Sequence, residues 1–195
     1  MTIDLLRALS KFEVANDQES EIAVFRTHVP WVAPLAYLHI IYKPAPHFLL
    51  EDLAEKLRMP KPCTQLLAKQ NGAHLFAGAL SIFGVHRQGQ LLNREDPFLA
   101  LPFNIEWENA ELKCLDRARF LAIGGYGFDG STVCIDRRDG RVSVFRRDET
   151  NPLVSWCDLE DWVNSEVARL SLLFDWRGKR LVDEIETVPK QSPAQ

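Results

Sequence analysis

The sequence predicts an α+β fold with helices packed on a mainly antiparallel β-sheet. Two patterns support this prediction. Stretches rich in β-branched and aromatic residues are joined by tight-turn residues, most clearly over residues 120–146. Segments with apolar residues three and four positions apart precede and follow them. Hydrophobic residues make up 46% of the 195 residues, which is enough to bury a core, so we expect a globular chain.

Residues 1–45 are predicted to form an N-terminal extension. A first helix over residues 3–12 has apolar residues at helical spacing, with Thr2 as its cap. Strand-like stretches follow at 21–25 and 35–42. Two closely spaced prolines, Pro44 and Pro46, favour extended backbone, so we place a boundary near residue 46.

The main domain, residues 46–178, is predicted to begin with two helices. The first is amphipathic and stops before Pro60, and the second is short and leaves through Asn71-Gly72. An apolar strand over residues 73–85 follows, and Gly84 either ends it or kinks it. Residues 86–116 show no clean period, which predicts a long connection with short helical pieces.

The second half of the domain is predicted to contain three strands and a long helix. The strands lie at 120–124, 131–136 and 141–146, and the last two form a hairpin around Asp139-Gly140 with one face in the core and one in solvent. Ser155 and Asp158 fit a capping pair for a helix that reaches residue 174. The tail, residues 179–195, is polar and is expected to fray.

Composition excludes several classes of function. The net charge is −4, which gives no general attraction to nucleic acid or anionic membranes but leaves a local basic patch open. The N-terminus lacks secretory-signal features, and no apolar run approaches the roughly 20 residues that cross a bilayer. The four cysteines and five histidines lack metal-ligand spacing. We therefore expect a cytoplasmic protein with reduced, mostly buried thiols, no cofactor and no metal.

The stretch IGGYGFDGS contains a literal G-x-G-x-x-G at Gly125, Gly127 and Gly130. A dinucleotide site needs these glycines between a strand and a helix, so that the helix N-terminus meets the phosphates. Here the following residues alternate as in a strand, and no helical apolar face appears. The pattern therefore predicts a tight turn between paired strands.

The order of these segments resembles the SUKH superfamily, which includes fungal cell-wall synthesis regulators and many bacterial immunity proteins. The resemblance covers about residues 47–175 and rests on LEDLAEKLRMPKPCTQLLAKQNG, on LSIFG, on FLAIGGYGFDGSTVCIDRRDGRVSVF and on SWCDLEDWVNSEV. Trp156 and Cys157 depart from the family pattern, and the first 45 residues and the tail have no counterpart in it. The motif positions, which the resemblance implies are structural, are Asn71, Gly72, Phe83, Gly84, Gly124, Asp129, Gly130 and Asp136.

Few residues point to chemistry. Asp129 and Asp136 are more typical of turn and strand-end residues than of a catalytic pair, and Ser81, within an apolar strand, is expected to bond backbone. The arginines of residues 137–147 alternate with acids, which favours a solvated hairpin, with phosphate binding a minor alternative. Trp107, between Glu106 and Glu108, fits an interface anchor for a basic partner, although core packing fits it as well.

The resemblance implies a non-catalytic binding protein. The expected function is that of an immunity protein, which neutralises a cognate toxin, often a nuclease, by protein–protein association. A regulatory or scaffold protein without a toxin partner is the alternative. An enzyme or nucleotide binder that uses the 124–130 glycine loop is a third hypothesis. The sequence leaves the oligomeric state and the binding face open.

Overall fold

The computed structural model describes residues 3–10, 12, 17–29, 36–86, 101–181 and 186–190. In these residues nine strands form one antiparallel sheet with helices packed on it, which confirms the predicted α+β class. The strands are β1 (Gln18–Glu19), β2 (Ala23–His28), β3 (Tyr37–Tyr42), β4 (Ala73–Leu75), β5 (Leu80–Ile82), β6 (Phe120–Tyr126), β7 (Thr132–Asp136), β8 (Val142–Phe145) and β9 (Val154–Trp156). The helices are α1 (Leu5–Ala8), α2 (His47–Lys56), α3 (Lys61–Leu67), α5 (Ile105–Glu111) and α6 (Leu159–Ser171).

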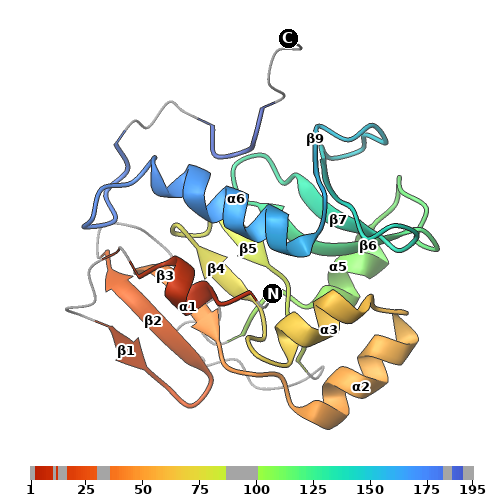
Figure 1. Ribbon diagram of the computed structural model, residues 1–195, viewed down its shortest axis with the longest axis horizontal. Helices are drawn as coiled ribbons and strands as arrows, with labels where there is room; N and C mark the ends of the chain where they lie inside the picture. The colour runs from red at the N-terminus through yellow and green to blue at the C-terminus, as the bar shows by residue number, and fades with distance from the viewer. Residues whose placement is uncertain are drawn as a thin grey trace.

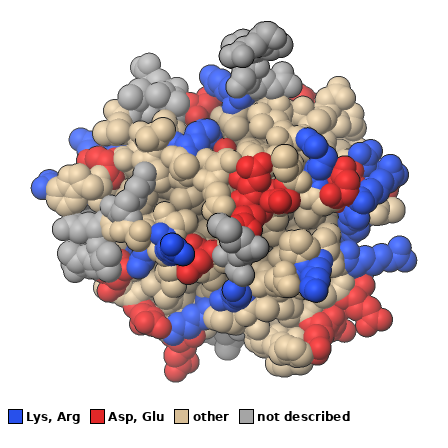
Figure 2. Space-filling view, viewed as in Figure 1, with Lys and Arg blue, Asp and Glu red and all other residues tan. Residues whose placement is uncertain are grey.

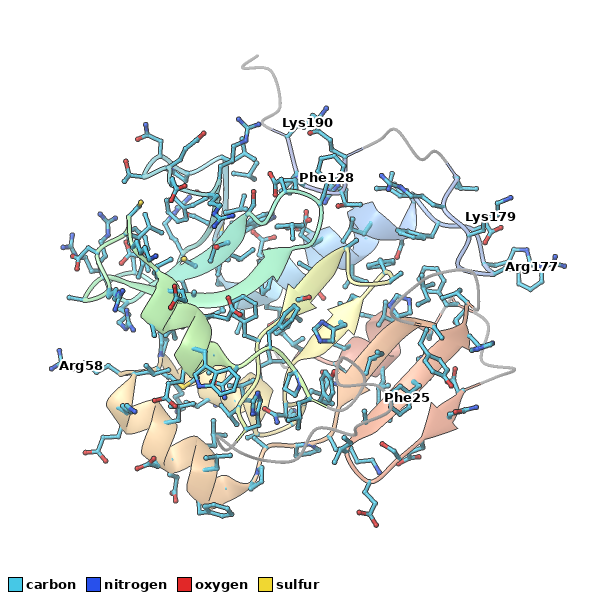
Figure 3. The ribbon with its side chains drawn as sticks, turned by 180° about the vertical axis from the view of Figure 1, so that it is seen from behind. Phe25, Arg58, Phe128, Arg177, Lys179 and Lys190 are labelled. Carbon is cyan, nitrogen blue, oxygen red and sulfur yellow. The ribbon has the colours of Figure 1, made fainter. Side chains whose placement is uncertain are left out.

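The strands lie in the sheet in the same order as in the sequence, from β1 to β9. Helix α6 lies across one face of this sheet, as Figure 1 shows, and α5 lies on the opposite face, in front of the sheet in Figure 3. Strand β3, from the predicted extension, pairs with β4, from the predicted main domain, with His39 opposite Leu75. The sheet is therefore continuous across the boundary proposed near residue 46.

Helix α6 packs tightly on the centre of the sheet. The side chain of Trp162 is fully buried, and a Cβ added to Gly124 on β6 would lie only 2.9 Å from the Trp162 ring. Beside it, Tyr126 donates a 2.6 Å hydrogen bond to the buried carboxylate of Glu166, which Arg169 also binds through two nitrogens. The buried charge is thus paired and hydrogen-bonded, as burial requires.

The helix caps differ from those predicted. Asp4 caps α1, since its carboxylate accepts from the backbone N–H of Arg7, whereas Thr2 lies outside the described residues. Asp158 alone caps α6, accepting from the Asp161 backbone N–H. Ser155 lies instead in β9, where its hydroxyl contacts that of Ser143 at 2.8 Å. In both cases an aspartate adjacent to the first turn serves as the cap.

Two predictions about strands were wrong. Residues 73–85 form two strands, β4 and β5, because Phe76, Ala77 and Gly78 all have positive φ and turn the chain back on itself. The hairpin of β7 and β8 forms around Gly140 as predicted, but both of its faces are buried. Cys134, on the face expected in solvent, is fully buried.

The connection between β6 and β7 confirms the interpretation of the glycine motif as a turn. Gly125 pairs with Thr132 within the sheet, and Gly130 takes a φ of +72° just before β7 begins. The Asp129 carboxylate accepts from the backbone N–H of Ser131 at 2.8 Å and closes the turn. No helix starts at Gly127 or Gly130, so this loop offers no helix N-terminus to a phosphate.

The last described residues pack on the sheet domain. Thr187 and Val188 are buried, and the Thr187 carbonyl accepts from Arg169. The expectation that the tail frays is wrong for these two residues, because Thr187 is bonded to α6 and the side chains of both are buried. Residues 182–185 and 191–195 lie outside the described residues.

Candidate functional site

The two faces of the sheet differ in what they present. On the face over α6, basic and acidic residues are interspersed, as Figure 2 shows. On the opposite face, α5 is flanked by two hollows of different character, described below, and carries the exposed side chain of Trp107. We therefore take α5 and its two flanks as the candidate site.

Two asparagines fix α5 in place. The Asn104 side chain caps the helix, accepting from the backbone N–H of Glu106 at 2.8 Å. Asn109 is buried, and its amide donates to the Ala122 carbonyl and accepts from the Ala122 N–H, at 2.8 and 2.9 Å. Beyond the end of β5, where none of the described strands lies beside β6 on this side, the Asn109 amide takes the place of a strand and binds the Ala122 backbone. Helix α5 is therefore attached to β6 by side-chain hydrogen bonds as well as by packing.

The three residues predicted to contact a partner all lie on α5. Trp107 is 47% exposed, with its ring edge-on to His86 at a centroid distance of 5.1 Å. Glu106 forms an ion pair with Lys56 of α2. Glu108 makes no side-chain hydrogen bond or ion pair within the described residues, and partial burial, together with the charge of Glu111, raises the pKa of its carboxyl. Because nearly half of its surface is exposed, Trp107 is not a core residue.

An apolar groove runs along one side of α5. Its volume is about 430 Å³, and it is lined by Phe83, Phe103 and the glycines of the β6–β7 turn. Phe103 lines the groove and is 42% exposed. Among the described residues lining it, Glu108 supplies the single formal charge. Such a groove suits a partner side chain with an apolar stem and a basic tip.

A buried His–Ser pair at the base of this groove was not predicted. His74 Nδ1 lies 2.9 Å from the Ser81 hydroxyl, which the sequence had suggested would bond backbone. Burial lowers the pKa of His74 to about 4, outweighing the opposite effect of a hydrogen bond that the imidazole donates to the backbone of Leu101. The imidazole is therefore neutral at pH 7 and a weak base, unlike a general base poised near neutrality. The pair joins β4 to β5.

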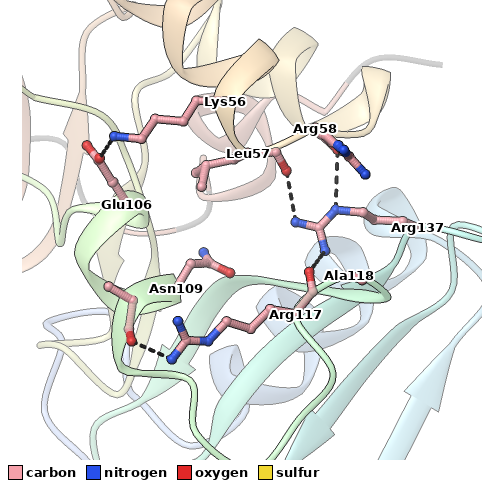
Figure 4. A pocket seen from close by; sticks show the side chains of 9 residues that line it. Lys56, Leu57, Arg58, Glu106, Asn109, Arg117, Ala118 and Arg137 are labelled. Atoms are coloured by element: carbon pink, nitrogen blue, oxygen red, sulfur yellow. Dashed lines mark hydrogen bonds and ion pairs between the residues drawn. The ribbon is translucent and has the colours of Figure 1, made fainter.

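A cationic hollow lies on the other side of α5, shown in Figure 4. Its volume is about 490 Å³. It lies between the end of α2, α5 and the start of the β7–β8 turn, and its charged lining residues are Lys56, Arg58, Glu106, Arg117 and Arg137.

Arg137 is not the solvated residue that the sequence suggested. Its guanidinium donates to the carbonyls of Leu57, Arg58, Arg117 and Phe120. It therefore joins the end of α2 to β6. The acids that alternate with it in the sequence bind other groups: Asp136 accepts from Arg119 at 2.6 Å and from the Arg138 backbone N–H at 2.9 Å.

Three of the motif residues, Asn71, Gly72 and Gly84, lie together and have a structural role. The Asn71 amide forms two hydrogen bonds with the backbone of Val85, at 2.7 and 2.8 Å. Gly72 has a φ of +82°, and a Cβ added to Gly84 would lie 2.3 Å from the Asn71 carbonyl oxygen. These three residues hold the end of α3 against the end of β5, where only glycine allows such close backbone approach.

The other motif residues are spread along the sheet. Phe83 lines the apolar groove beside Gly125, and Gly124 faces α6. Asp129 and Asp136 lie before and at the end of β7 respectively, and each binds backbone N–H groups, so they do not form a carboxylate pair.

Two general properties concern the described part of the chain. Within it, no three His, Cys, Asp or Glu side chains are grouped so that they could hold a metal ion, and no helix has the length and apolar character to span a membrane. Cys63 and Cys134 are buried, whereas Cys114 and Cys157 are exposed, so the expectation of mostly buried thiols holds for two of the four. The expected lack of a cofactor stays a prediction.

Comparison with known proteins leaves the family open. No model of a known protein family matches the chain, and a search of curated proteins found no similar sequence. Membership of the SUKH superfamily therefore stays a prediction that rests on the sequence motifs and is consistent with the α+β fold.

Proposed function

We propose that this chain is a non-catalytic cytoplasmic protein that binds another protein through the surface around α5. The observation that carries the proposal is the half-exposed Trp107 beside Glu108, a carboxylate with no ion-pair partner in the described residues. Tryptophans of this kind dominate interface energies, provided that the surrounding contacts exclude water. The adjacent groove, lined by Phe83 and Phe103, offers a pocket for a partner side chain.

Charge favours a basic partner on the side of α5 that carries Glu108 and the apolar groove, away from the cationic hollow. Helix α5 carries Glu106, Glu108 and Glu111, and the whole chain has a net charge of −4. An arriving Lys or Arg would pair with Glu108, whose raised pKa reflects the cost of leaving its charge unpaired and partly desolvated. Such complementarity would speed association and fix orientation more than it would add affinity.

The resemblance to the SUKH superfamily makes a cognate toxin, a nuclease among others, the proposed partner. Binding would neutralise the toxin by covering its active site or a nearby surface. A nuclease fits the acidic α5 surface, because enzymes that bind nucleic acid expose basic residues. A regulatory or scaffold role would use the same surface for a partner that is not a toxin.

Co-expression with the product of the neighbouring gene tests the proposal. We expect a purified complex, rescue of cell growth, and a loss of roughly 30-fold in affinity for Trp107→Ala, equivalent to about 2 kcal/mol. Trp176→Ala is the matched control, since Trp176 is 52% exposed but follows α6 and stacks on Arg177 rather than on α5 residues. The control should bind like the unaltered chain.

Three outcomes separate the alternatives. Binding with growth rescue supports immunity, and binding without rescue supports the scaffold role. A Trp107→Ala variant that binds as tightly as the Trp176→Ala control refutes the α5 surface. Measuring the pKa of Glu108 by NMR adds a direct check, because pairing with a partner cation should lower it.

A further inference from the structure

We propose that the cationic hollow beside α5 binds the phosphate group of a small phosphorylated molecule. The lining residues Lys56, Arg58, Arg117 and Arg137 carry four positive charges, against one negative charge on Glu106. This excess stands out in a chain whose net charge is −4. Because the charges come from separate segments, only the fold brings them together.

Two of the arginines are held in fixed orientations. Arg137 donates to four backbone carbonyls, as described above, and Arg117 donates to the carbonyls of Leu112 and Ala110, both at 2.7 Å. Arg117 Nη1 has no hydrogen-bond partner within the described residues, so its two N–H groups are available. Figure 4 shows the two guanidinium groups at separate parts of the lining, that of Arg137 against the end of α2 and that of Arg117 beyond Asn109. The free Nη1 of Arg117 suits phosphate oxygens, because little side-chain entropy is lost when a fixed guanidinium binds. Arg137 has one N–H left beyond its four backbone contacts, so it contributes mainly its charge.

Arg58 occupies a backbone conformation that favours glycine. Its φ is +47°, in the left-handed region, directly after the C-cap of α2. Arg58 is among the residues that line the hollow, and its side chain extends outward from the end of α2, as Figure 3 shows. This side chain makes no hydrogen bond or ion pair within the described residues. A strained position that holds a cation where glycine would fit better indicates that the charge has a use.

Repulsion between the cations favours a bound anion, and the lining and volume of the hollow limit what else the ligand can carry. Burial and the nearby Arg58 charge lower the pKa of Arg137, so a bound anion would relieve the repulsion between these cations. Asp116 lies close enough to oppose this shift, yet it is not among the residues lining the hollow. The described lining residues include no aromatic side chain, so stacking of a base is not provided for. A volume of about 490 Å³ nevertheless leaves room for a small organic group beyond the phosphate.

Titration at constant ionic strength tests this proposal, with inorganic phosphate and glycerol phosphate as probes and backbone amide NMR shifts as the readout. We expect saturable shifts at residues lining the hollow. Arg58→Gly should weaken binding about tenfold, as expected for loss of a charge-assisted contact. The same change relieves the left-handed backbone, so its thermal midpoint should equal or exceed that of the unaltered chain.

Arg138→Ala is the control, because Arg138 is an exposed cation beside Arg137, in the turn between β7 and β8, that does not line the hollow. It should bind phosphate like the unaltered chain. A second variant, Lys56→Gln, removes another cation of the lining and should also weaken binding.

Several results would overturn the proposal. They are the absence of saturable shifts, equal weakening by Arg58→Gly and Arg138→Ala, or tighter binding of a polyglutamate peptide than of either phosphate probe, which would assign the hollow to an acidic protein. Binding only to vesicles that contain phosphatidic acid would assign it to a membrane surface. None of these outcomes depends on Trp107 or on a protein partner.

Discussion

The attachment of α5 to the sheet by Asn109 gives the sharpest test of the structure. In Asn109→Ala, the N–H and C=O of Ala122 lose the partners that the amide supplied at 2.9 and 2.8 Å. Each buried backbone group left unpaired costs about 1–3 kcal/mol. Because Asn109 also lines the cationic hollow, water can reach these groups in part, which favours the lower half of that range.

At about 1–2 kcal/mol for each of the two groups, and with about 0.5 kcal/mol regained from the better helix propensity of alanine, the expected net loss is roughly 1.5–3.5 kcal/mol in the free energy of unfolding. Urea unfolding followed by circular dichroism measures it as a lower midpoint with an unchanged m-value. Glu111→Ala on the same helix is the control, since Glu111 is exposed and its contact with Lys113 is long, at 3.8 Å. The control should stay within about 0.5 kcal/mol of the unaltered chain.

An Asn109→Ala variant as stable as the Glu111→Ala control would refute this reasoning. It would mean that α5 is held by apolar packing alone and that the Ala122 backbone finds other partners.

Two further predictions concern the core. Gly124→Ala should lower the free energy of unfolding by about 2 kcal/mol or more, because the added Cβ would lie 2.6 Å from the Ser81 carbonyl oxygen. Gly130→Ala meets no neighbour and should lower it by only about 1 kcal/mol, because of the positive φ at this position. Equal losses in the two variants on chemical denaturation would contradict this contrast. Burial lowers the pKa of His39 to about 3, with a smaller contribution from Arg26, and that of His74 to about 4. Below about pH 6.5 these histidines are therefore protonated in the unfolded chain but stay neutral in the folded chain. As the pH falls from about 6.5 to 4.5, the free energy of unfolding should decrease by up to about 1.4 kcal/mol per pH unit for each histidine. His74→Phe should flatten this slope by about half and the exposed His47→Phe should not, so equal slopes in the two variants would rule the explanation out.

The sequence predicted the elements whose periodicity is local. The amphipathic helices α2 and α6 and the hairpin of β7 and β8 were found because apolar spacing and an Asp-Gly turn mark them. The split of β4 from β5 was missed, because Phe76 and Ala77 adopt positive φ, which their residue types do not favour.

The candidate site was predictable only in part. Trp107 was singled out because an aromatic residue among acids is unusual, and the structure places it on the surface. The cationic hollow was missed because its charges come from distant parts of the sequence; Arg58 and Arg137, for example, are 79 residues apart. Asn109 would stand out as a polar residue on the inward face of α5, but the sequence did not define this helix, so the position could not be recognised.

The strand order has a consequence for synthesis on the ribosome. Each strand pairs only with the strands before and after it in the sequence, so the sheet can grow from β1 to β9 as the chain emerges, without waiting for a distant partner. Helix α6 comes after all nine strands and brings Trp162 and Glu166 to the buried face. A nascent chain halted before residue 159 would therefore expose that face to chaperones, and completion of α6 would be the step that removes it from their reach.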